Sequence, residues 1–323
     1  NAVLCIKTKT SERTKISYSE GISHKLSMRR NHRALASRRL FREGGMHMVV
    51  GVIGTGSMGS VIIHALLRSG AIEPESLIIH NRTTSKAMAI ANRFPGVRVS
   101  CSPVETAVSS QLLFLCVKPL EVAPLLDKIA LFLRRDQVLV SIASPVMIGL
   151  LERTVSCKVA KVIPSLTIHE SRGAALCMYG ERMTERDKER LERLLGAFSV
   201  PVRIEEKHVR AASDLTSIGP AFVAFFVQRL AEAAAKRSGM PVEHAERLAG
   251  EMVLGTGLLL VQGGFTLDDI QRKISVPGGI TARALDTLRE HIGGLFDDIL
   301  TATHRKFDED VAKVTAMLEN RQA

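Results

Sequence analysis

A glycine-rich turn near residue 55 carries the clearest chemical pattern in the sequence. Gly54, Gly56 and Gly59 follow an apolar run that begins at Met48 and precede a stretch of helical periodicity. In a strand–turn–helix unit, the first glycine permits a tight turn, the second lets the backbone approach a pyrophosphate, and the third lets the helix pack on the sheet. The amides at the start of the helix then face the phosphates. The spacing predicts a dinucleotide-binding turn made of Gly54, Thr55, Gly56, Ser57, Met58 and Gly59.

The residues after the second predicted strand bear on the choice between NADP(H) and NAD(H). An NAD site usually has Asp or Glu there, about 20 residues beyond the glycines, to accept a hydrogen bond from the ribose 2′-hydroxyl. This chain instead has Asn81, Arg82 and Thr83, followed by two more hydroxyl residues. A guanidinium and hydroxyls suit a 2′-phosphate. NADP(H) is therefore the predicted cofactor, with NAD(H) less favoured. A solvated turn with a helix N-cap at Thr84 or Ser85 is a compatible interpretation.

The elements that must position these residues alternate between apolar strands and helices. Continuous apolar strands interleaved with helices indicate a parallel sheet covered on both faces. We therefore predict an α/β fold with an N-terminal Rossmann domain, whose sheet is doubly wound and mostly parallel. The predicted strands are Met48–Ile53, Leu77–His80, Val97–Ser100, Leu112–Val117, Val138–Ile142, Lys158–Ile163, Ala174–Tyr179 and Val200–Ile204. The predicted helices are Met58–Ser69, Ser85–Arg93, Val104–Ser109, Val122–Leu133 and Thr184–Phe198.

Beyond about residue 207 the pattern is entirely helical. The first helix of this half, Pro220–Ser238, is apolar on nearly every face of its first three turns, so it must be buried in a core or a subunit interface. An interface is favoured, because a domain of this length has little interior. Gly255 and Gly257 lie within the following helix and are not a second nucleotide turn. The remaining predicted helices are Val242–Val261, Leu267–Ile274, Thr281–Glu290 and Leu295–Leu318.

Composition narrows the classes of protein further. Hydrophobic residues make up 46% and charged residues 24% of the 323, the usual proportions of a soluble globular chain. The best apolar run for a membrane helix, Leu248–Val261, is shorter than the roughly 18 residues needed and is interrupted by Glu251 and Gly255. The five cysteines form no Cys-x-x-Cys pair, which favours a reducing, cytoplasmic compartment without a zinc site. No metal and no membrane are expected.

The net charge of +11 is concentrated in residues 1–45, which hold 11 Lys or Arg and 3 Glu. The rest of the chain is nearly balanced and poor in aromatic residues, so no nucleic-acid partner is expected there. Three interpretations of residues 1–45 compete: a nucleic-acid-binding arm, an organelle transit peptide, and a disordered extension upstream of a natural start at Met46 or Met48. The third is favoured.

From about Met48 to the C-terminus the chain resembles pyrroline-5-carboxylate reductase. The segments that carry the resemblance are Val-Ile-Gly-Thr-Gly-Ser-Met-Gly (52–59), Phe-Leu-Cys-Val-Lys-Pro (114–119), Gly-Pro-Ala-Phe-Val (219–223) and Pro-Gly-Gly-Ile-Thr-Ala (277–282). Within that family it looks closer to the late-competence paralogues of the ComER type. That likeness rests on Lys-Val-Ile-Pro-Ser-Leu-Thr (161–167), Ala-Ala-Ser-Asp-Leu (211–215) and Thr-His-Arg-Lys-Phe-Asp-Glu-Asp (303–310).

The resemblance implies a Rossmann NADP-binding domain at 46–206 and an all-helical dimerisation and substrate domain at 207–323. It also implies a homodimer formed through the helical domain, with a higher oligomer left open. The implied reaction is NADPH-dependent reduction of the C=N bond of pyrroline-5-carboxylate, a small cyclic imino acid, to proline. Each active site would then combine the nucleotide domain of one subunit with helical loops of its partner.

The resemblance also assigns residues to the site. Asn81 and Arg82 would lie at the adenosine ribose or its phosphate. The cofactor loop beside the nicotinamide would be Val117, Lys118 and Pro119, and Lys118 is also a candidate catalytic residue. The loop that grips the substrate carboxylate would be Val276, Pro277, Gly278, Gly279 and Thr281, where adjacent glycines expose amides as an anion nest. The hydroxyl of Thr281 would donate a hydrogen bond to the carboxylate or the imine nitrogen.

Three substrate-side segments depart from the family pattern. Met-Pro-Asn-Thr-Pro becomes Ile-Pro-Ser-Leu-Thr at 163–167, which puts Ser165 in a substrate-binding position, and Leu-Ser-Gly-Ser-Gly-Pro becomes Leu-Thr-Ser-Ile-Gly-Pro at 215–220. Val276 replaces a serine before Pro-Gly-Gly. A hydroxyl donor lost from a buried carboxylate site costs about 1–3 kcal/mol. His169, just beyond the first segment, is either a cleft residue or, as is usual for loop histidines, a surface residue.

These departures leave three functions open. The first is reduction of pyrroline-5-carboxylate itself. The second is the same chemistry on another small cyclic imino or oxo acid with a more apolar ring. The third is NADP(H) binding without catalysis, as in a regulatory protein of the competence type.

Overall fold

The computed structural model describes residues 48–319, which form two compact units. The first unit comprises residues 48–206 together with 311–319, and the second is Lys207–Asp310. The predictions made for residues 1–45 fall outside the described residues.

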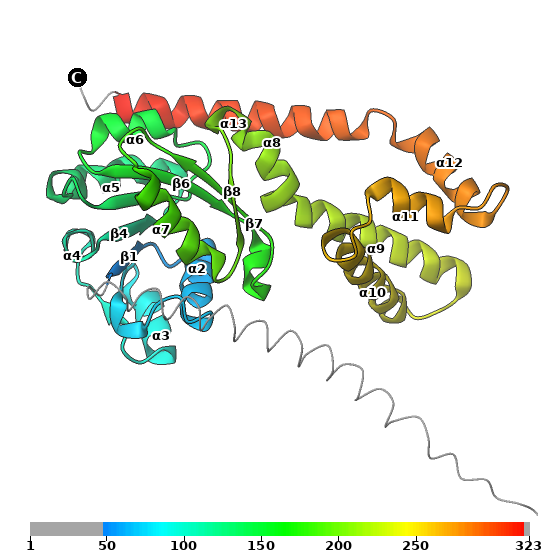
Figure 1. Ribbon diagram of the computed structural model, residues 1–323, viewed down its shortest axis with the longest axis horizontal. Helices are drawn as coiled ribbons and strands as arrows, with labels where there is room; N and C mark the ends of the chain where they lie inside the picture. The colour runs from blue at the N-terminus through cyan, green and yellow to red at the C-terminus, as the bar shows by residue number, and fades with distance from the viewer. Residues whose placement is uncertain (1–47, 320–323) are drawn as a thin grey trace, which may run out of the picture. The chain divides into compact units, whose positions relative to one another are not determined.

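An eight-stranded sheet of described residues forms the centre of the first unit (Figure 1). Its strands lie in the order β3-β2-β1-β4-β5-β6-β7-β8, and every neighbouring pair is parallel except β6 with β7. The order reverses between β1 and β4, which is where open α/β sheets bind ligands at the carboxyl ends of their strands. The strands are β1 Val50–Ile53, β2 Leu77–His80, β3 Arg98–Val99, β4 Leu112–Leu115, β5 Val138–Ser141, β6 Lys158–Pro164, β7 Ala174–Tyr179 and β8 Val200–Arg203.

Helices cover both faces of this sheet, which confirms the doubly wound, mostly parallel prediction. Every residue of β1 and β4 is buried, as expected for parallel strands between two helical layers. Val50 and Val52 belong to a core shared with α2 Ser57–Arg68, α3 Thr84–Arg93 and α7 Glu185–Gly196. The alternate residues, such as Leu113 and Leu139, are buried on the other face. That face carries α4 Pro103–Ser109, α5 Pro119–Ile129 and α6 Ile148–Thr154.

Two helices of the first unit differ from the sequence-based expectation. Helix α6 was not predicted, because its seven residues make only two turns and leave no clear periodic signal. Helix α5 begins at Pro119 rather than at Val122. Proline is favoured at the first position of a helix, where its missing N–H has no intrahelical partner to lose.

The second unit is helical throughout its described residues. Its helical run begins at Val209, earlier than the predicted start at Pro220, and passes through a π-helical turn at Asp214–Ile218. The Gly-x-Gly at 255–257 lies inside α10, as predicted. The helices are α8 Val209–Ser213, α9 Gly219–Ser238, α10 Val242–Val261, α11 Leu267–Ile274, α12 Ile280–Ile292 and the first part of α13 Leu295–Glu319.

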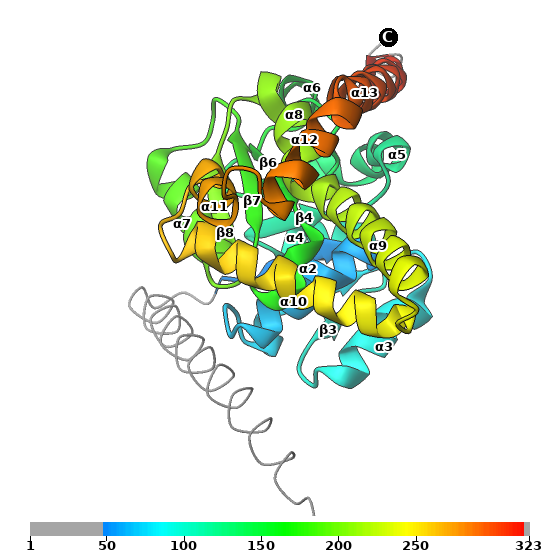
Figure 2. The same ribbon diagram turned by 90° about the vertical axis from the view of Figure 1, so that its right-hand side faces the viewer.

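Helix α9 packs against α10 (Figure 2) but leaves most of its apolar surface uncovered. Within the described chain, Ala231 alone among the α9 residues is buried, and the side chains of Phe225 and Leu230 are more than half exposed. The run Glu206–Ser238 is long and apolar enough to cross a membrane by length and composition alone, with 6% of its apolar window buried. By these criteria Glu206–Ser238, rather than Leu248–Val261, is the best candidate for a membrane-spanning helix among the described residues. A subunit interface, as predicted, equally requires such a surface.

The end of α13 returns to the first unit. Val314 and Leu318 are buried, and Glu319 lies 3.7 Å from Arg153 of α6. The second unit therefore ends at Asp310, whereas the sequence assigned the whole of 207–323 to the helical domain. One helix of 25 residues gives no sequence signal of a boundary within it.

Candidate functional site

The glycine-rich turn directly follows β1 and leads into α2. Gly54 has a φ of +100°, and a Cβ there would collide with the carbonyl oxygen of Cys116. A Cβ on Gly59 would collide with the carbonyl oxygen of Gly54. A Cβ on Gly56, by contrast, would meet no described atom within 4 Å. The outer two glycines therefore permit close packing of turn, helix and β4, while Gly56 keeps the space before the helix clear.

Polar groups in this turn fit a dinucleotide. Gly56 is the N-cap of α2, and the first turn of this helix contains no acidic residue. Among the described residues, no side chain caps the start of α2. The buried Oγ1 of Thr55 has no hydrogen-bond partner among the described residues. Free amides at the positive end of a helix dipole bind phosphate groups. The turn thus offers amides and an unused hydroxyl where a pyrophosphate would lie.

Asn81 ties the turn to the end of β2. The Thr55 amide donates a hydrogen bond to Asn81 Oδ1 at 3.0 Å, and Asn81 Nδ2 donates to the carbonyl of Thr83 at 3.0 Å. The Gly54 amide donates to the carbonyl of His80 at 2.8 Å. Both ends of the Asn81 side chain are engaged, so it holds the glycine turn and the loop after β2 together.

Arg82 extends from the same loop into solvent. Its side chain is 90% exposed, and Nη1 lies 3.1 Å from Oε1 of Glu121 in the first turn of α5. This partner could not be predicted from the sequence, because 39 residues separate Arg82 from Glu121. The N-cap of α3 is Thr83, without a side-chain hydrogen bond among the described residues, rather than Thr84 or Ser85 as predicted.

The loop after β4 lies beside the glycine turn. The Cys116 amide donates to the carbonyl of Ile53 at 2.8 Å, and a Cβ on Gly54 would lie 3.2 Å from Cγ1 of Val117. Lys118 is the exposed N-cap residue of α5 and Pro119 its first residue. The Cys116 side chain is buried, and this burial raises the pKa of its thiol to about 12.

Ser165 is buried at the end of β6, and its own turn uses its hydroxyl. Its Oγ accepts a hydrogen bond from the Thr167 hydroxyl at 2.8 Å and another from the Thr167 amide at 3.3 Å. It thereby caps the 3-10 turn Leu166–Glu170. His169, in the same turn, is exposed, and its Nδ1 lies 3.0 Å from Glu170. His169 is thus a surface residue in this structure.

The loop before α12 contains the other predicted substrate residues. Pro277 precedes Gly278, which has a φ of +73°, and the Gly279 amide donates to the carbonyl of Val276 at 2.9 Å. Gly279 is the N-cap of α12, which has no acidic residue in its first turn, and Thr281 is the second residue of the helix. An open pocket here is lined by Gly278, Gly279, Ile280, Arg283, Ala284 and Thr287. The Gly278 amide and the amides at the start of α12 favour an anionic group here.

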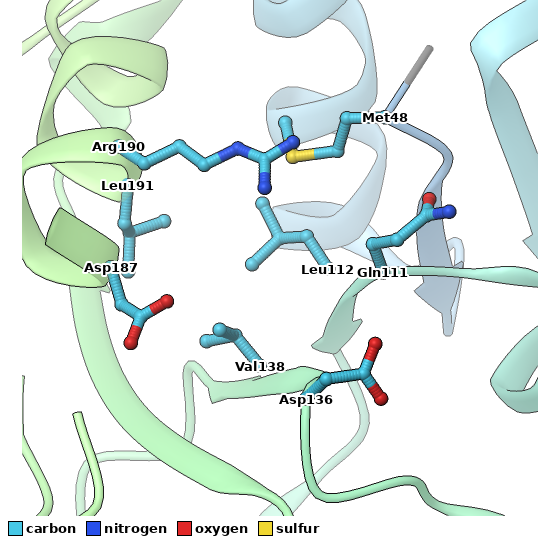
Figure 3. A pocket seen from close by; sticks show the side chains of 8 residues that line it. All are labelled: Met48, Gln111, Leu112, Asp136, Val138, Asp187, Arg190 and Leu191. Carbon is cyan, nitrogen blue, oxygen red and sulfur yellow. The ribbon is translucent and has the colours of Figure 1, made fainter. Parts of the chain in front are cut away.

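Another pocket lies at the opposite edge of the sheet (Figure 3). Its residues precede or begin β1, β4 and β5, or lie on α7, and thus line the amino edge of these strands. The glycine turn is at the carboxyl edge, so this pocket is separate from the dinucleotide site. Its lining residues are Met48, Gln111, Leu112, Asp136, Val138, Asp187, Arg190 and Leu191.

The structure therefore joins the turn after β1, the loop after β2 and the loop after β4 at one edge of a doubly wound sheet. This arrangement and the helical unit define a dinucleotide-binding protein of the Rossmann class with an appended helical region. The sequence profile described as "Pyrroline-5-carboxylate reductase dimerisation" matches residues 206–310. The profile described as "NADP oxidoreductase coenzyme F420-dependent" matches residues 49–145.

Two relatives from Bacillus subtilis (strain 168) match nearly their whole length. "ComE operon protein 4" is 37% identical over 267 residues, covering 83% of this chain and 98% of the relative. "Pyrroline-5-carboxylate reductase 3" is 31% identical over 271 residues, covering 82% and 99%. The chain belongs to the pyrroline-5-carboxylate reductase family, whose members are NAD(P)-dependent oxidoreductases, and it carries the family's dimerisation region.

Solved structures share this fold. The pyrroline carboxylate reductase of Plasmodium falciparum with NADP bound has a TM-score of 0.70 at 22% identity, covering 84% of this chain and 98% of that one. A pyrroline-5-carboxylate reductase from Coxiella burnetii has a TM-score of 0.72 at 20% identity, covering 84% and 99%.

Proposed function

We propose that this protein is an NADPH-dependent reductase of 1-pyrroline-5-carboxylate that forms proline. The likeness to "Pyrroline-5-carboxylate reductase 3" along 99% of that relative supports the substrate and reaction. The glycine turn carries the proposal, because open space at Gly56 and the unused hydroxyl of Thr55 suit a bound pyrophosphate. The helical unit is proposed to form a homodimer through the exposed apolar surface of α9.

NADPH is proposed over NADH because Arg82, rather than an acid, follows Asn81 at the end of β2. Its high exposure lets it reach a 2′-phosphate from solvent, provided that it exchanges Glu121 for the phosphate. A phosphate offers more charge and more acceptor oxygens than a carboxylate, which favours the exchange.

The chain's own groups would bind and orient the imino acid. When bound, the nicotinamide supplies a hydride for the imine carbon. The Gly278 amide and the amides at the start of α12 would bind the substrate carboxylate, and the Thr281 hydroxyl would donate a hydrogen bond to that carboxylate or to the imine nitrogen. Val117, Lys118 and Pro119 are proposed as the loop beside the nicotinamide, with Lys118 the second candidate for catalysis.

A second function is favoured by the substrate-side residues. Ser165 uses its hydroxyl within its own turn, and Val276, 63% exposed, offers an apolar side chain at the carboxylate loop. Together with the 37% identity to "ComE operon protein 4", these observations support a protein that binds NADP(H) without turning over pyrroline-5-carboxylate. The same side chains would also suit an imino or oxo acid with a more apolar ring.

The test is oxidation of NADPH by the full chain with saturating pyrroline-5-carboxylate, with NADH in parallel and NADPH binding followed by fluorescence. Proline-linked oxidation that favours NADPH supports the reductase. NADPH binding without turnover supports the second function. Turnover confined to a cyclic imine with a more apolar ring would keep the chemistry and change the substrate.

A further inference from the structure

Lys161 is a fully buried cation near the middle of β6, with 0% of its side chain exposed. Its Nζ donates to Oε1 of Glu206 at 2.7 Å and to the carbonyl oxygen of Ser144 at 2.8 Å, and it lies 3.9 Å from Sδ of Met147. An ammonium has three donors, and burying it is unfavourable unless all three are satisfied. All three therefore have partners, and two of these partners lie in the loop between β5 and α6.

Glu206 holds the end of the same loop. Its Oε1 also accepts a hydrogen bond from the backbone amide of Ile148 at 3.0 Å. Ile148 is the first residue of α6, and within residues 48–319 the side chain of its N-cap residue, Met147, does not cap the helix. Lys161 and Glu206 thus fix residues 142–147 at the carbonyl of Ser144 and at the start of α6.

The position of this loop connects it with the cofactor. A dinucleotide places its adenosine ribose after β2 and its pyrophosphate after β1. Because β1 is followed in the sheet by β4 and β5, the other half of the molecule extends over the ends of those two strands. Residues 142–147 directly follow β5. Within them, the buried Oγ of Ser144 has no partner among the described residues.

We propose that Lys161, acting through Glu206, is a positioning residue that holds the 142–147 loop in the shape that receives the nicotinamide half of the cofactor. The inference rests on the dinucleotide-binding part of the proposed function and needs no turnover of the imino acid. Burial lowers the pKa of Lys161, although Glu206 acts in the opposite direction. The pairing with Glu206 favours the charged form that these contacts require.

Lys158, on the same strand, provides a matched control. Its Nζ lies 2.7 Å from Oδ2 of Asp187, the same separation as in the Lys161 pair. Asp187 lines the pocket at the amino edge of the sheet (Figure 3), away from the predicted cofactor. Loss of either lysine removes an ion pair from β6, but only Lys161 contacts the loop after β5.

The experiment compares two ligands of the full chain by calorimetry: NADPH, and 2′-phospho-ADP-ribose, which lacks the nicotinamide. Lys161→Met is expected to weaken NADPH binding about tenfold, equivalent to about 1.4 kcal/mol, and to leave the affinity for 2′-phospho-ADP-ribose unchanged. Lys158→Met should change neither affinity. Glu206→Gln keeps a side-chain oxygen that can accept from both Lys161 and the Ile148 amide. It should therefore weaken NADPH binding by a smaller factor than Lys161→Met does. It also keeps the proposal testable if the Lys161→Met variant does not fold.

If Lys161→Met and Glu206→Gln each reduce the affinities for NADPH and for 2′-phospho-ADP-ribose by the same factor, the proposal is overturned, since that result would indicate a general structural role. Unchanged binding of both ligands would overturn it as well. A wild-type chain that binds NADPH yet leaves pyrroline-5-carboxylate unreduced would end the reductase proposal alone, because the two-ligand comparison would still test Lys161.

Discussion

Arg82 and Glu121 form an ion pair of 3.1 Å that joins the loop after β2 to the first turn of α5. These elements lie on either side of the glycine turn, because β2 and β4 flank β1 in the sheet. A 2′-phosphate that binds Arg82 must therefore compete with the Glu121 carboxylate. If Arg82 reads the 2′-phosphate as proposed, Glu121 opposes the resulting preference for NADPH.

Replacing Arg82 and replacing Glu121 should change the NADPH affinity in opposite directions. Arg82→Ala should weaken NADPH binding about tenfold, because one charge-assisted contact is lost, and should leave the NADH affinity unchanged. Glu121→Gln should tighten NADPH by a smaller factor, because the guanidinium no longer has a competing carboxylate. Fluorescence titration with both nucleotides measures this, with Arg134→Ala, which removes a different exposed ion pair, as the control. Equal effects on NADH and NADPH would argue against 2′-phosphate recognition by Arg82.

Replacing Gly56 and replacing Gly59 should have different effects. Gly56→Ala should keep the thermal stability of the wild type, because its Cβ meets open space, but should lose NADPH affinity by tenfold or more, since that Cβ would occupy the pyrophosphate position. Gly59→Ala should lower the melting temperature, because its Cβ would press on the Gly54 carbonyl and neither backbone can yield cheaply. Melting curves with and without NADPH separate the two effects. A Gly56→Ala variant that binds like the wild type would place the pyrophosphate elsewhere.

The sequence predicted the carboxyl edge of the sheet well, because each part of it has a local signal. Each of these signals can be recognised from a few neighbouring residues: the glycine spacing, the lack of an acidic residue after β2, and the apolar strands. Ion pairs between distant segments have no such signal. Lys161 lies in a strand whose other residues, apart from Lys158, are apolar, and nothing near it indicates that its partner is Glu206, 45 residues later. The antiparallel direction of β7 and the return of α13 to the first unit likewise depend on packing across the whole chain.

The substrate side illustrates the same limit. Ser165 stands where the resemblance placed a ligand-binding side chain, yet its hydroxyl accepts hydrogen bonds within its own turn. Residue type alone could not distinguish a serine that caps a turn from one that faces a ligand, since both commonly follow a strand. The short helix α6, which has no clear periodic signal, also lacks a local start signal, because the amide of its first residue, Ile148, donates to Glu206 from another element.

Asp187 should make the stability of the first unit sensitive to acid. Burial by itself would raise its pKa, but hydrogen bonds from Lys158 and Thr184 outweigh burial and lower the pKa below its usual value. A lowered folded-state pKa contributes stability above the unfolded value, about 3.9, and that contribution is lost as the pH falls through the folded-state pKa. Asp187→Asn should therefore be less stable than the wild type at neutral pH, and the difference should shrink below about pH 4. Urea unfolding at pH 7 and at low pH measures it; a difference that stays constant with pH would assign the effect to packing.

The exposed apolar surface of α9 should control assembly. Leu230 is 57% exposed and Phe225 54% exposed in the single chain, so a partner must cover them if the helix is to escape water. Leu230→Glu should shift the protein towards monomers, because a buried unpaired carboxylate costs far more than the apolar contact it replaces. Lys236→Glu, an exposed change in the last turn of the same helix, should leave assembly intact. Light scattering after gel filtration gives the mass of each variant. A Leu230→Glu variant with the mass of the wild-type oligomer would place the interface on another surface of the helical unit.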